Sequence, residues 1–327
     1  MRSTRPSAAQ AAEQETTAGQ PPSAHGSATG SERAAPGSLA AAVEVPTAVS
    51  RAKVSRRLTR PAQGCDREGL LKGKKALVFG VANDHSIAWG IARALYDQGA
   101  EVGFSSMASL IKRRVRPLAA SIGSTFVEPC DVRDDDEIRR VFERWKAREG
   151  NLDILVHAVA FAEKEDLAGH FADTSRDGFH TAFDISVYSL IAMAREARPY
   201  MLPGSSIITM TYYGAVKVVP HYNVMGVAKA ALEATTRYLA ADLGPSGIRV
   251  NAISAGPVRT LSAHGIAGFK TMYGAFAEVA PLRSHITIED VAGTAVFLAS
   301  SLSGQTTGET IYVDGGFNIL GLPVADE

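Results

Sequence analysis

The pattern of apolar and polar positions changes at about residue 70, and from there two periodicities alternate along the chain. Short runs of apolar and β-branched residues have the length of buried strands, whereas longer segments carry apolar residues at helical spacing. The strands are predicted at residues 76–79, 101–105, 125–129, 153–158, 206–211, 248–254 and 310–313. The helices are predicted at 86–98, from the basic positions 112–114 to 122, at 134–148, in a long segment ending near 200, at 224–243, and from a capping-box pattern at 287–290 onward. Such alternation needs right-handed crossovers, so we predict one parallel, seven-stranded, doubly wound α/β sheet with helices on both faces.

Residues 1–69 have a different composition from the rest of the chain. They are rich in Ala, Ser, Thr, Gly and Pro, contain no Phe, Trp or Tyr, and show no sustained periodicity. Such a segment cannot bury enough apolar surface to offset the entropy lost on ordering, so we predict a disordered tail at 1–69 and a single domain at 70–327. Basic residues between 51 and 60 would suit an organelle transit peptide, which Glu13 and Glu15 argue against. The other interpretation is a dispensable tail or an over-long gene start.

Charge and cysteine content exclude several classes of protein. The chain has 34 basic and 34 acidic residues, and this balance argues against binding to nucleic acid or to an anionic membrane. No apolar run is long enough to span a bilayer. Cys65 and Cys130 form neither a disulfide framework nor a metal-ligand spacing, which fits a reducing compartment. The eight His are scattered, and we predict no metal site.

A tyrosine and a lysine share the helix predicted after the fifth strand. Tyr222 lies at the start of this helix and Lys229 lies seven positions later, so both side chains can face one side. An ammonium lowers the cost of a phenolate or an oxyanion beside it, and a phenol can donate a proton to a developing charge. A surface Tyr and a surface Lys on one amphipathic helix would give the same pattern, so the pair alone does not establish a site.

The turn after the first strand suits a dinucleotide. Gly80 ends the strand, and Ser86, Ile87 and Gly90 follow at the start of the first helix. A glycine-rich turn at this place is where a pyrophosphate binds, on the positive end of the helix. The spacing differs from GxGxxG, but its position in a seven-strand alternation predicts a Rossmann-type fold.

The positions that would select the cofactor are less decisive. Asp131 follows the third strand and could accept a hydrogen bond from an adenine amino group, although an ordinary helix N-cap region would look the same. The second strand ends at 104–107 without the acidic residue expected for a ribose 2′-hydroxyl, and without an Arg placed for a 2′-phosphate. Lys112 and Arg113 come one helical turn later. These residues leave the choice between NADH and NADPH open.

Four motifs together are specific to one family. They are Gly80-x5-Ser86-Ile87-x2-Gly90 and the segments 212–229, 250–261 and 313–317. With these motifs, the chain from residue 70 onward resembles the bacterial NADH-dependent enoyl-acyl-carrier-protein reductases, a divergent branch of the short-chain dehydrogenase/reductase superfamily. Ordinary members of the superfamily have Tyr-x3-Lys and a Ser on the fifth strand. Here Lys229 lies seven positions after Tyr222, and Tyr212 takes the place of the Ser. Tyr213 and Lys217 match Tyr-x3-Lys by chance, in the loop before the helix.

The resemblance implies reduction of trans-2-enoyl thioesters on acyl carrier protein by hydride from NADH, the last step of each fatty-acid elongation cycle. Tyr222 would hydrogen-bond the thioester carbonyl, Lys229 would hold the nicotinamide ribose hydroxyls, and Tyr212 would be a second catalytic tyrosine. Ala162 would contact the acyl substrate. The other cofactor-binding residues that the resemblance implies are Gly80, Ser86, Ile87, Met107, Asp131, Val132, Val159, Val258, Arg259, Thr260, Leu261 and Ser262.

Departures from the family pattern bear on the cofactor and the partner. Ala158 and Ala160 stand where the family usually has Ser and Gly, and the methyl group of Ala160 comes close to the cofactor's path. The segment 264–272 keeps only Lys270 of the basic residues that meet the acidic carrier protein. The long insertion of the plant enzymes is absent, which favours a bacterial cytoplasmic enzyme over a plastid one. Family members are homotetramers, and we expect the same assembly here.

Two other functions stay open from the sequence. One is a related NAD(P)H-dependent reductase of another activated alkene or carbonyl in a specialised pathway, which Ala160 and Tyr213 would allow. The other is a nucleotide-binding regulator that binds the cofactor without hydride transfer. The presence of Tyr212, Tyr222 and Lys229 argues against the regulator.

Overall fold

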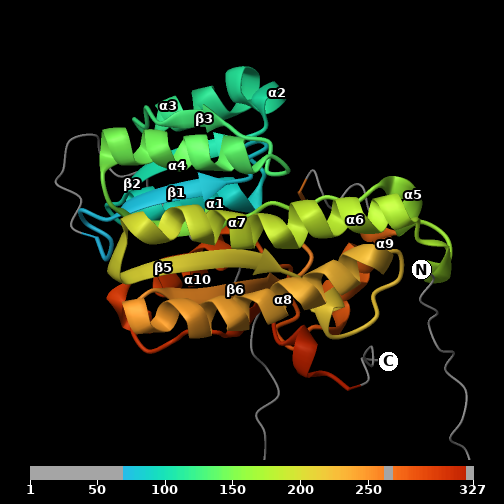
Figure 1. Ribbon diagram of the computed structural model, residues 1–327. Helices are drawn as coiled ribbons and strands as arrows, with labels where there is room; N and C mark the ends of the chain where they lie inside the picture. Colours follow the sequence, from blue (N-terminus) through green and yellow to red (C-terminus); the bar gives the residue numbers. More distant parts are fainter. Residues whose placement is uncertain (1–68, 261–267, 322–327) are drawn as a thin grey trace, which may run out of the picture. The chain divides into compact units, whose positions relative to one another are not determined.

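The computed structural model describes residues 69–260 and 268–321. The tail predicted at 1–69 therefore lies outside the described residues, apart from Gly69. The described chain forms a seven-stranded parallel sheet in the order β3-β2-β1-β4-β5-β6-β7, with helices on both of its faces (Figure 1). The predicted doubly wound, Rossmann-type architecture is confirmed.

All seven predicted strands are present. They are β1 (Lys75–Phe79), β2 (Glu101–Ser106), β3 (Val127–Pro129), β4 (Leu152–His157), β5 (Met201–Thr211), β6 (Arg249–Ala255) and β7 (Thr310–Val313). The start of β5 was predicted too late, because Pro203 and Gly204 interrupt the apolar pattern there. Its first residues nevertheless pair with β4, beside an irregularity in the register between Leu152 and Ile154.

The helices differ from the prediction in four places. They are α1 (Ile87–Asp97), α2 (Ala108–Leu110), α3 (Arg116–Ser121), α4 (Asp135–Glu149), α5 (Lys164–Leu167), α6 (Arg176–Phe183), α7 (Ser189–Ala197), α8 (Asn223–Leu243), α9 (Phe269–Val279) and α10 (Ile288–Ala299). π-Helical turns at Ile111–Val115 and Asp184–Tyr188 divide two helices that were predicted as continuous. Helices α5 and α9 were not predicted. None of the described helices has the length and apolar character needed to cross a membrane.

The predicted N-terminus of α10 is confirmed in detail. The Thr287 hydroxyl accepts from the backbone N–H of Asp290, and the Asp290 carboxylate accepts from the backbone N–H of Thr287 at 2.8 Å. The two residues thus satisfy two N–H groups that have no partner within the helix, although Asp replaces the usual Glu.

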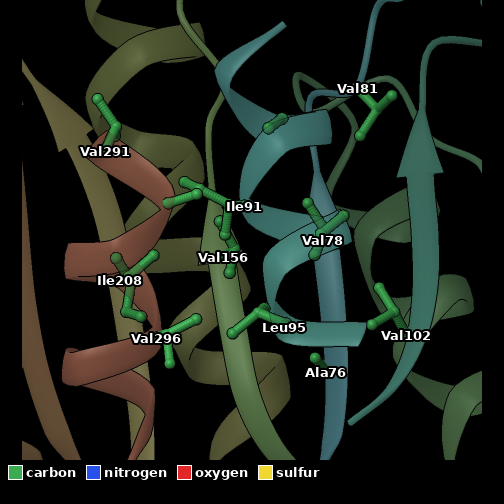
Figure 2. Close-up of a cluster of buried hydrophobic side chains, with 14 of the residues drawn as sticks. Ala76, Val78, Val81, Ile91, Leu95, Val102, Val156, Ile208, Val291 and Val296 are labelled. Atoms are coloured by element: carbon green, nitrogen blue, oxygen red, sulfur yellow. The ribbon is translucent and has the colours of Figure 1, made fainter. Parts of the chain in front are cut away.

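Two hydrophobic clusters hold the sheet between the helices. Val78 and Val156 point to the face covered by α1 and α10, where Ile91 and Val291 pack against them (Figure 2). The next residue along β1, Leu77, points to the opposite face and the cluster under α4, α7 and α8. Because successive side chains of a strand alternate between faces, a sheet buried on both sides needs continuous apolar runs, as the sequence has. The resulting rigid sheet fixes the loops at the carboxyl ends of its strands.

The chain changes direction across the sheet between β1 and β4. These two strands are neighbours in the sheet. From β1, the sheet continues through β2 and β3 to one edge, and from β4 it continues through β5, β6 and β7 to the other. In a doubly wound sheet, this switch point leaves a crevice outside the carboxyl ends of the strands, where ligands bind. Gly80 follows β1 at this point, and Ala158 follows β4.

Candidate active site

The turn after β1 leaves space only for a glycine. Gly80 has φ 97°, and a Cβ atom there would lie 2.1 Å from the carbonyl oxygen of Ala158. Ser86 caps α1, with its hydroxyl accepting from the N–H of Trp89 at 3.4 Å, and the first turn of the helix carries no acidic residue. The start of α1 therefore presents backbone N–H groups, without an acidic side chain to offset their partial positive charge. Such a helix N-terminus is suited to binding a pyrophosphate. These residues fit a dinucleotide.

Tyr222 is held in a strained backbone segment at the start of α8. Its neighbours His221 and Asn223 both have positive φ angles, of 61° and 33°. Non-glycine residues in this region cost free energy, and such strain clusters at functional sites. A Cβ on Gly214 would come within 2.5 Å of the Tyr222 ring, so the loop after β5 closes tightly over it. The backbone on both sides thus fixes the position of the phenol.

The two predicted catalytic tyrosines lie together. The rings of Tyr212 and Tyr222 meet edge-on, with centroids 4.9 Å apart. Burial raises the pKa of Tyr212 to about 12. Burial also raises the pKa of Tyr222 well above its usual range, with a further contribution from Tyr212. Burial therefore disfavours the phenolate that a nearby ammonium was expected to favour, and Tyr222 is a phenol that can donate a hydrogen bond.

Lys229 lies inside the protein, so the interpretation of a surface Tyr and a surface Lys is wrong. Its side chain is 5% exposed, and its Nζ donates to the carbonyl oxygen of Met210 at 2.8 Å. Burial lowers the pKa of Lys229 to about 8, against the charge of Glu233, which raises it. An ammonium has three donors. Among the described residues one is engaged by Met210, which leaves two for ligand oxygens.

A cavity of about 520 Å³ is lined by some of the predicted cofactor, substrate and catalytic residues, although Lys229 and Gly80 are not among its lining residues. Ile87, Ala162, Tyr212, Tyr222, Val258 and Thr260 all line it. Most of the wall is apolar, with a few polar groups, as is typical of sites for small organic ligands. The structure thus brings together residues from five separate parts of the sequence.

One wall of this cavity comes from a helix that was not predicted. Phe269 and Met272 of α9 line it. Phe269, Met272 and Phe276 do recur at helical spacing, which could have revealed α9. The surrounding mixture of Gly, Lys and Thr obscured that signal.

A buried histidine beneath the site was also missed. His157 ends β4, and its Nδ1 and Nε2 lie 2.8 Å from the hydroxyl oxygens of Thr209 and Ser189. Since the Ser189 hydroxyl donates to the carbonyl of Ile185, it accepts from Nε2–H, and Nδ1 then accepts from Thr209. Burial lowers the pKa of His157 to about 3, with a smaller contribution from the charge of Lys229. His157 is therefore neutral and fully hydrogen-bonded.

The remaining predicted cofactor residues follow the carboxyl ends of their strands. Met107, after β2, is exposed, and Val159, after β4, packs at the edge of a core cluster. Asp131, after β3, pairs with Arg133, whose hydrogen bond lowers the pKa of the Asp131 carboxyl group. Val132 is buried in the core. All four lie along the same edge of the sheet as Gly80.

The segment after β6 is described in part. Val258 is buried, and Arg259 is exposed with its guanidinium 4.4 Å from the centroid of the Tyr273 ring. Leu261 and Ser262, also predicted to bind the cofactor, lie outside the described residues. The geometry therefore places Val258 and Thr260 at the cavity and orients Arg259 toward α9.

Comparisons with known proteins agree on one family. The family model described as enoyl-(acyl carrier protein) reductase matches residues 80–318. An enoyl-[acyl-carrier-protein] reductase [NADH] of Rhizobium meliloti is 50% identical over 258 residues, which are 79% of this chain and 96% of the relative. A Bacillus cereus enzyme of the same name is 52% identical over 254 residues, covering 77% of this chain and 99% of the relative.

Solved structures give the same result. The Bacillus cereus enoyl-acyl carrier protein reductase with NADP+ and indole naphthyridinone matches with a TM-score of 0.76 and 52% identity, over 78% of this chain and all of that chain (100%). The Aquifex aeolicus enzyme matches with a TM-score of 0.75 and 50% identity, with the same coverage (78% and 100%). These relatives are bacterial proteins, so the plastid alternative gains no support.

Proposed function

The chain belongs to the enoyl-(acyl carrier protein) reductase family, and from this premise we propose how its own residues carry the reaction. The enzyme reduces trans-2-enoyl-acyl-carrier-protein thioesters to saturated acyl thioesters by hydride transfer from NADH, in fatty-acid synthesis. The observation that supports the residue roles is the cavity in which the Tyr212–Tyr222 pair meets the start of α1.

Cofactor binding is assigned to the crevice at the switch point. NADH, when bound, supplies the hydride that reaches the β-carbon of the substrate. The N–H groups at the start of α1, with Gly80, Ser86 and Ile87, bind the pyrophosphate. Lys229 gives its two remaining donors to the ribose hydroxyls. Met107, Asp131, Val132 and Val159 lie toward the adenosine, and Val258 and Thr260 lie toward the nicotinamide.

Tyr222 stabilises the charge that develops on the substrate. Hydride addition to a conjugated thioester puts negative charge on the carbonyl oxygen, as an enolate, so the reaction needs a hydrogen-bond donor at that oxygen. The raised pKa of Tyr222 keeps its proton on the phenol, ready to be donated. The charge of Lys229 on the same helix adds to this stabilisation, and the apolar cavity strengthens both effects by excluding water.

Tyr212 orients Tyr222 and shapes the acyl site. Its ring contacts Tyr222 edge-on, and its hydroxyl lies 3.5 Å from the sulfur of Met272 on α9. Ala162, Met225 and Phe269 complete the apolar wall, which suits the hydrocarbon part of the substrate better than a polar one.

The partner is the acyl carrier protein that bears the substrate. We assign its docking to the mouth of the cavity near α9, where the exposed Lys270 offers a positive charge. We also propose a homotetramer in the cytoplasm. Ile191 on α7 and Val227 and Tyr238 on the adjacent α8 expose apolar surface of the kind that subunit contacts cover, and Tyr238 is 81% exposed.

The function is tested by following oxidation of NADH and NADPH with a trans-2-enoyl thioester, presented as the CoA and as the carrier-protein conjugate. We expect turnover with NADH that is faster on the carrier conjugate. Cofactor binding without turnover on either thioester would support a reductase of another activated alkene or a nucleotide-binding regulator instead.

A further inference from the structure

A buried carboxylate lies one helical turn from the catalytic lysine. Glu233 follows Lys229 by four positions on α8, and it is only 7% exposed. The hydroxyl of Thr211 donates to its Oε1 at 2.8 Å. A carboxylate is costly to bury unless it has partners, so this position needs an explanation beyond packing. None of the roles assigned above uses Glu233.

The partners of Lys229 and Glu233 are successive residues of one strand. Lys229 binds the carbonyl of Met210, and Glu233 binds the side chain of Thr211. These are the last two residues of β5, and the next residue is Tyr212. Helix α8 therefore makes two side-chain hydrogen bonds to the end of β5, immediately before Tyr212, which contacts Tyr222.

We propose that Glu233 is a positioning residue of the reductase. Through Thr211 it fixes the end of β5 and hence the orientation of Tyr212 against Tyr222, and its negative charge favours the ammonium form of Lys229. This inference rests on the roles proposed for Tyr212, Tyr222 and Lys229. It differs from a purely structural role because it predicts a change in the pH dependence of the reaction.

The charges around the pair are consistent with this assignment. Arg237 follows Glu233 by one more turn of α8 and, with Thr211 and Lys229, opposes the burial that raises the pKa of the Glu233 carboxyl group. From β7, Tyr312 faces Glu233, and its own pKa is raised by burial first and by that carboxylate second. From β4, His157 faces Lys229 as a neutral group. Among the described residues, Glu233 is therefore the carboxylate whose charge acts on Lys229.

Removing the charge has a predictable sign. Lys229 is active as the ammonium, which is lost as the pH rises through its pKa of about 8. Glu233 raises that pKa, so without its charge the pKa falls further. The alkaline limb of the pH profile should then move to lower pH.

Two kinds of variant separate the charge from the hydrogen bond. Glu233→Gln keeps an oxygen for Thr211 and removes the carboxyl group, whereas Thr211→Val keeps the carboxyl group and removes the hydroxyl. Both are compared with wild type for kcat/KM against pH, with NADH and an enoyl thioester. We expect the alkaline limb of Glu233→Gln to move to lower pH. We expect Thr211→Val to lower kcat roughly tenfold through misplacement of Tyr212, and Thr211→Ser to restore it.

The controls make failure informative. Asp242→Asn removes a carboxylate from an exposed position of the same helix, and it should leave the alkaline limb of the pH profile unchanged. An unchanged limb in Glu233→Gln, or an unchanged kcat in Thr211→Val, would overturn the proposal, even if the thermal midpoint falls. Tyr222→Phe is measured alongside. If that variant also keeps full turnover, the error lies in the assigned catalytic roles rather than in Glu233.

Discussion

Tyr212 and Tyr222 meet edge-on, with ring centroids 4.9 Å apart and ring planes at 72° to each other. One ring follows the end of β5 and the other stands at the start of α8, so the contact joins the two elements that form the catalytic side of the cavity. Edge-to-face aromatic pairs add about 0.5–1.5 kcal/mol to the burial of the rings. Each ring thereby restricts the rotation of the other, and the ring and the hydroxyl of Tyr222 can be tested separately.

Tyr222→Phe keeps this ring contact and removes only the hydroxyl. Because the hydroxyl stabilises charge that develops during the reaction, kcat should fall about 10²–10³-fold, the usual cost of losing one such donor. The dissociation constant of NADH should change little. Steady-state kinetics with a carrier-protein thioester and a fluorescence titration with NADH measure the two effects. Equal losses of turnover and of NADH affinity would contradict the assigned role.

Lys229→Met tests the link between the buried ammonium and the cofactor. NADH affinity should fall in the variant, since the ribose hydroxyls lose a charged donor. In the wild type, affinity should weaken as the pH rises through the Lys229 pKa of about 8, because the ammonium form disappears. Titrations from neutral to alkaline pH should show this weakening in the wild type and not in Lys229→Met. The same weakening in both proteins would assign the pH dependence to another group.

Two glycines with left-handed backbone angles give a matched test of the cofactor turn. Gly80 and Gly73 have φ angles of 97° and 75°, but a Cβ at Gly73 would meet no atom within 4 Å. Gly73→Ala should therefore cost only backbone strain, about 1 kcal/mol, and leave NADH binding intact. Gly80→Ala adds a clash with Ala158, so we expect roughly 3 kcal/mol or more and a loss of NADH affinity. Chemical denaturation and NADH titration measure both effects, and similar behaviour of the two variants would argue against a close approach at Gly80.

The elements predicted correctly are those whose signal is local. Most of the strands contain a short apolar run, and Thr287 and Asp290 of the capping box lie three residues apart. Tyr222 and Lys229 were found for the same reason, since both lie on one helix. Helix α9 was missed because its apolar residues are mixed with polar ones and with Gly274.

The parts of the site that were not predicted depend on distant partners. Glu233 looks like a solvated position on a helix until the fold brings Thr211, 22 positions away, into contact with it. His157 likewise interrupts an apolar strand, and its partners Thr209 and Ser189 are 52 and 32 positions away. A polar residue in such a pattern can be a surface position or a buried, hydrogen-bonded one. Only the packing of the elements distinguishes the two cases.

His157 should make the fold sensitive to acid. The pKa of His157 is about 3 in the folded protein, against 6.5 for a histidine that is not buried. At a pH between these two values, the unfolded chain binds a proton that the folded chain excludes. The stability of the fold is therefore undiminished above the pKa of the unfolded chain. Below that pKa it decreases as the pH falls, by up to about 1.4 kcal/mol per pH unit. His157→Gln keeps an amide for Thr209 and Ser189 and cannot take up this proton. Urea unfolding at about pH 7 and about pH 5 should show a smaller loss of stability in the variant than in the wild type. All other titrating groups are common to the two proteins, so equal losses would mean that His157 is protonated without unfolding, and that its bonds to Thr209 and Ser189 do not exclude the charged form.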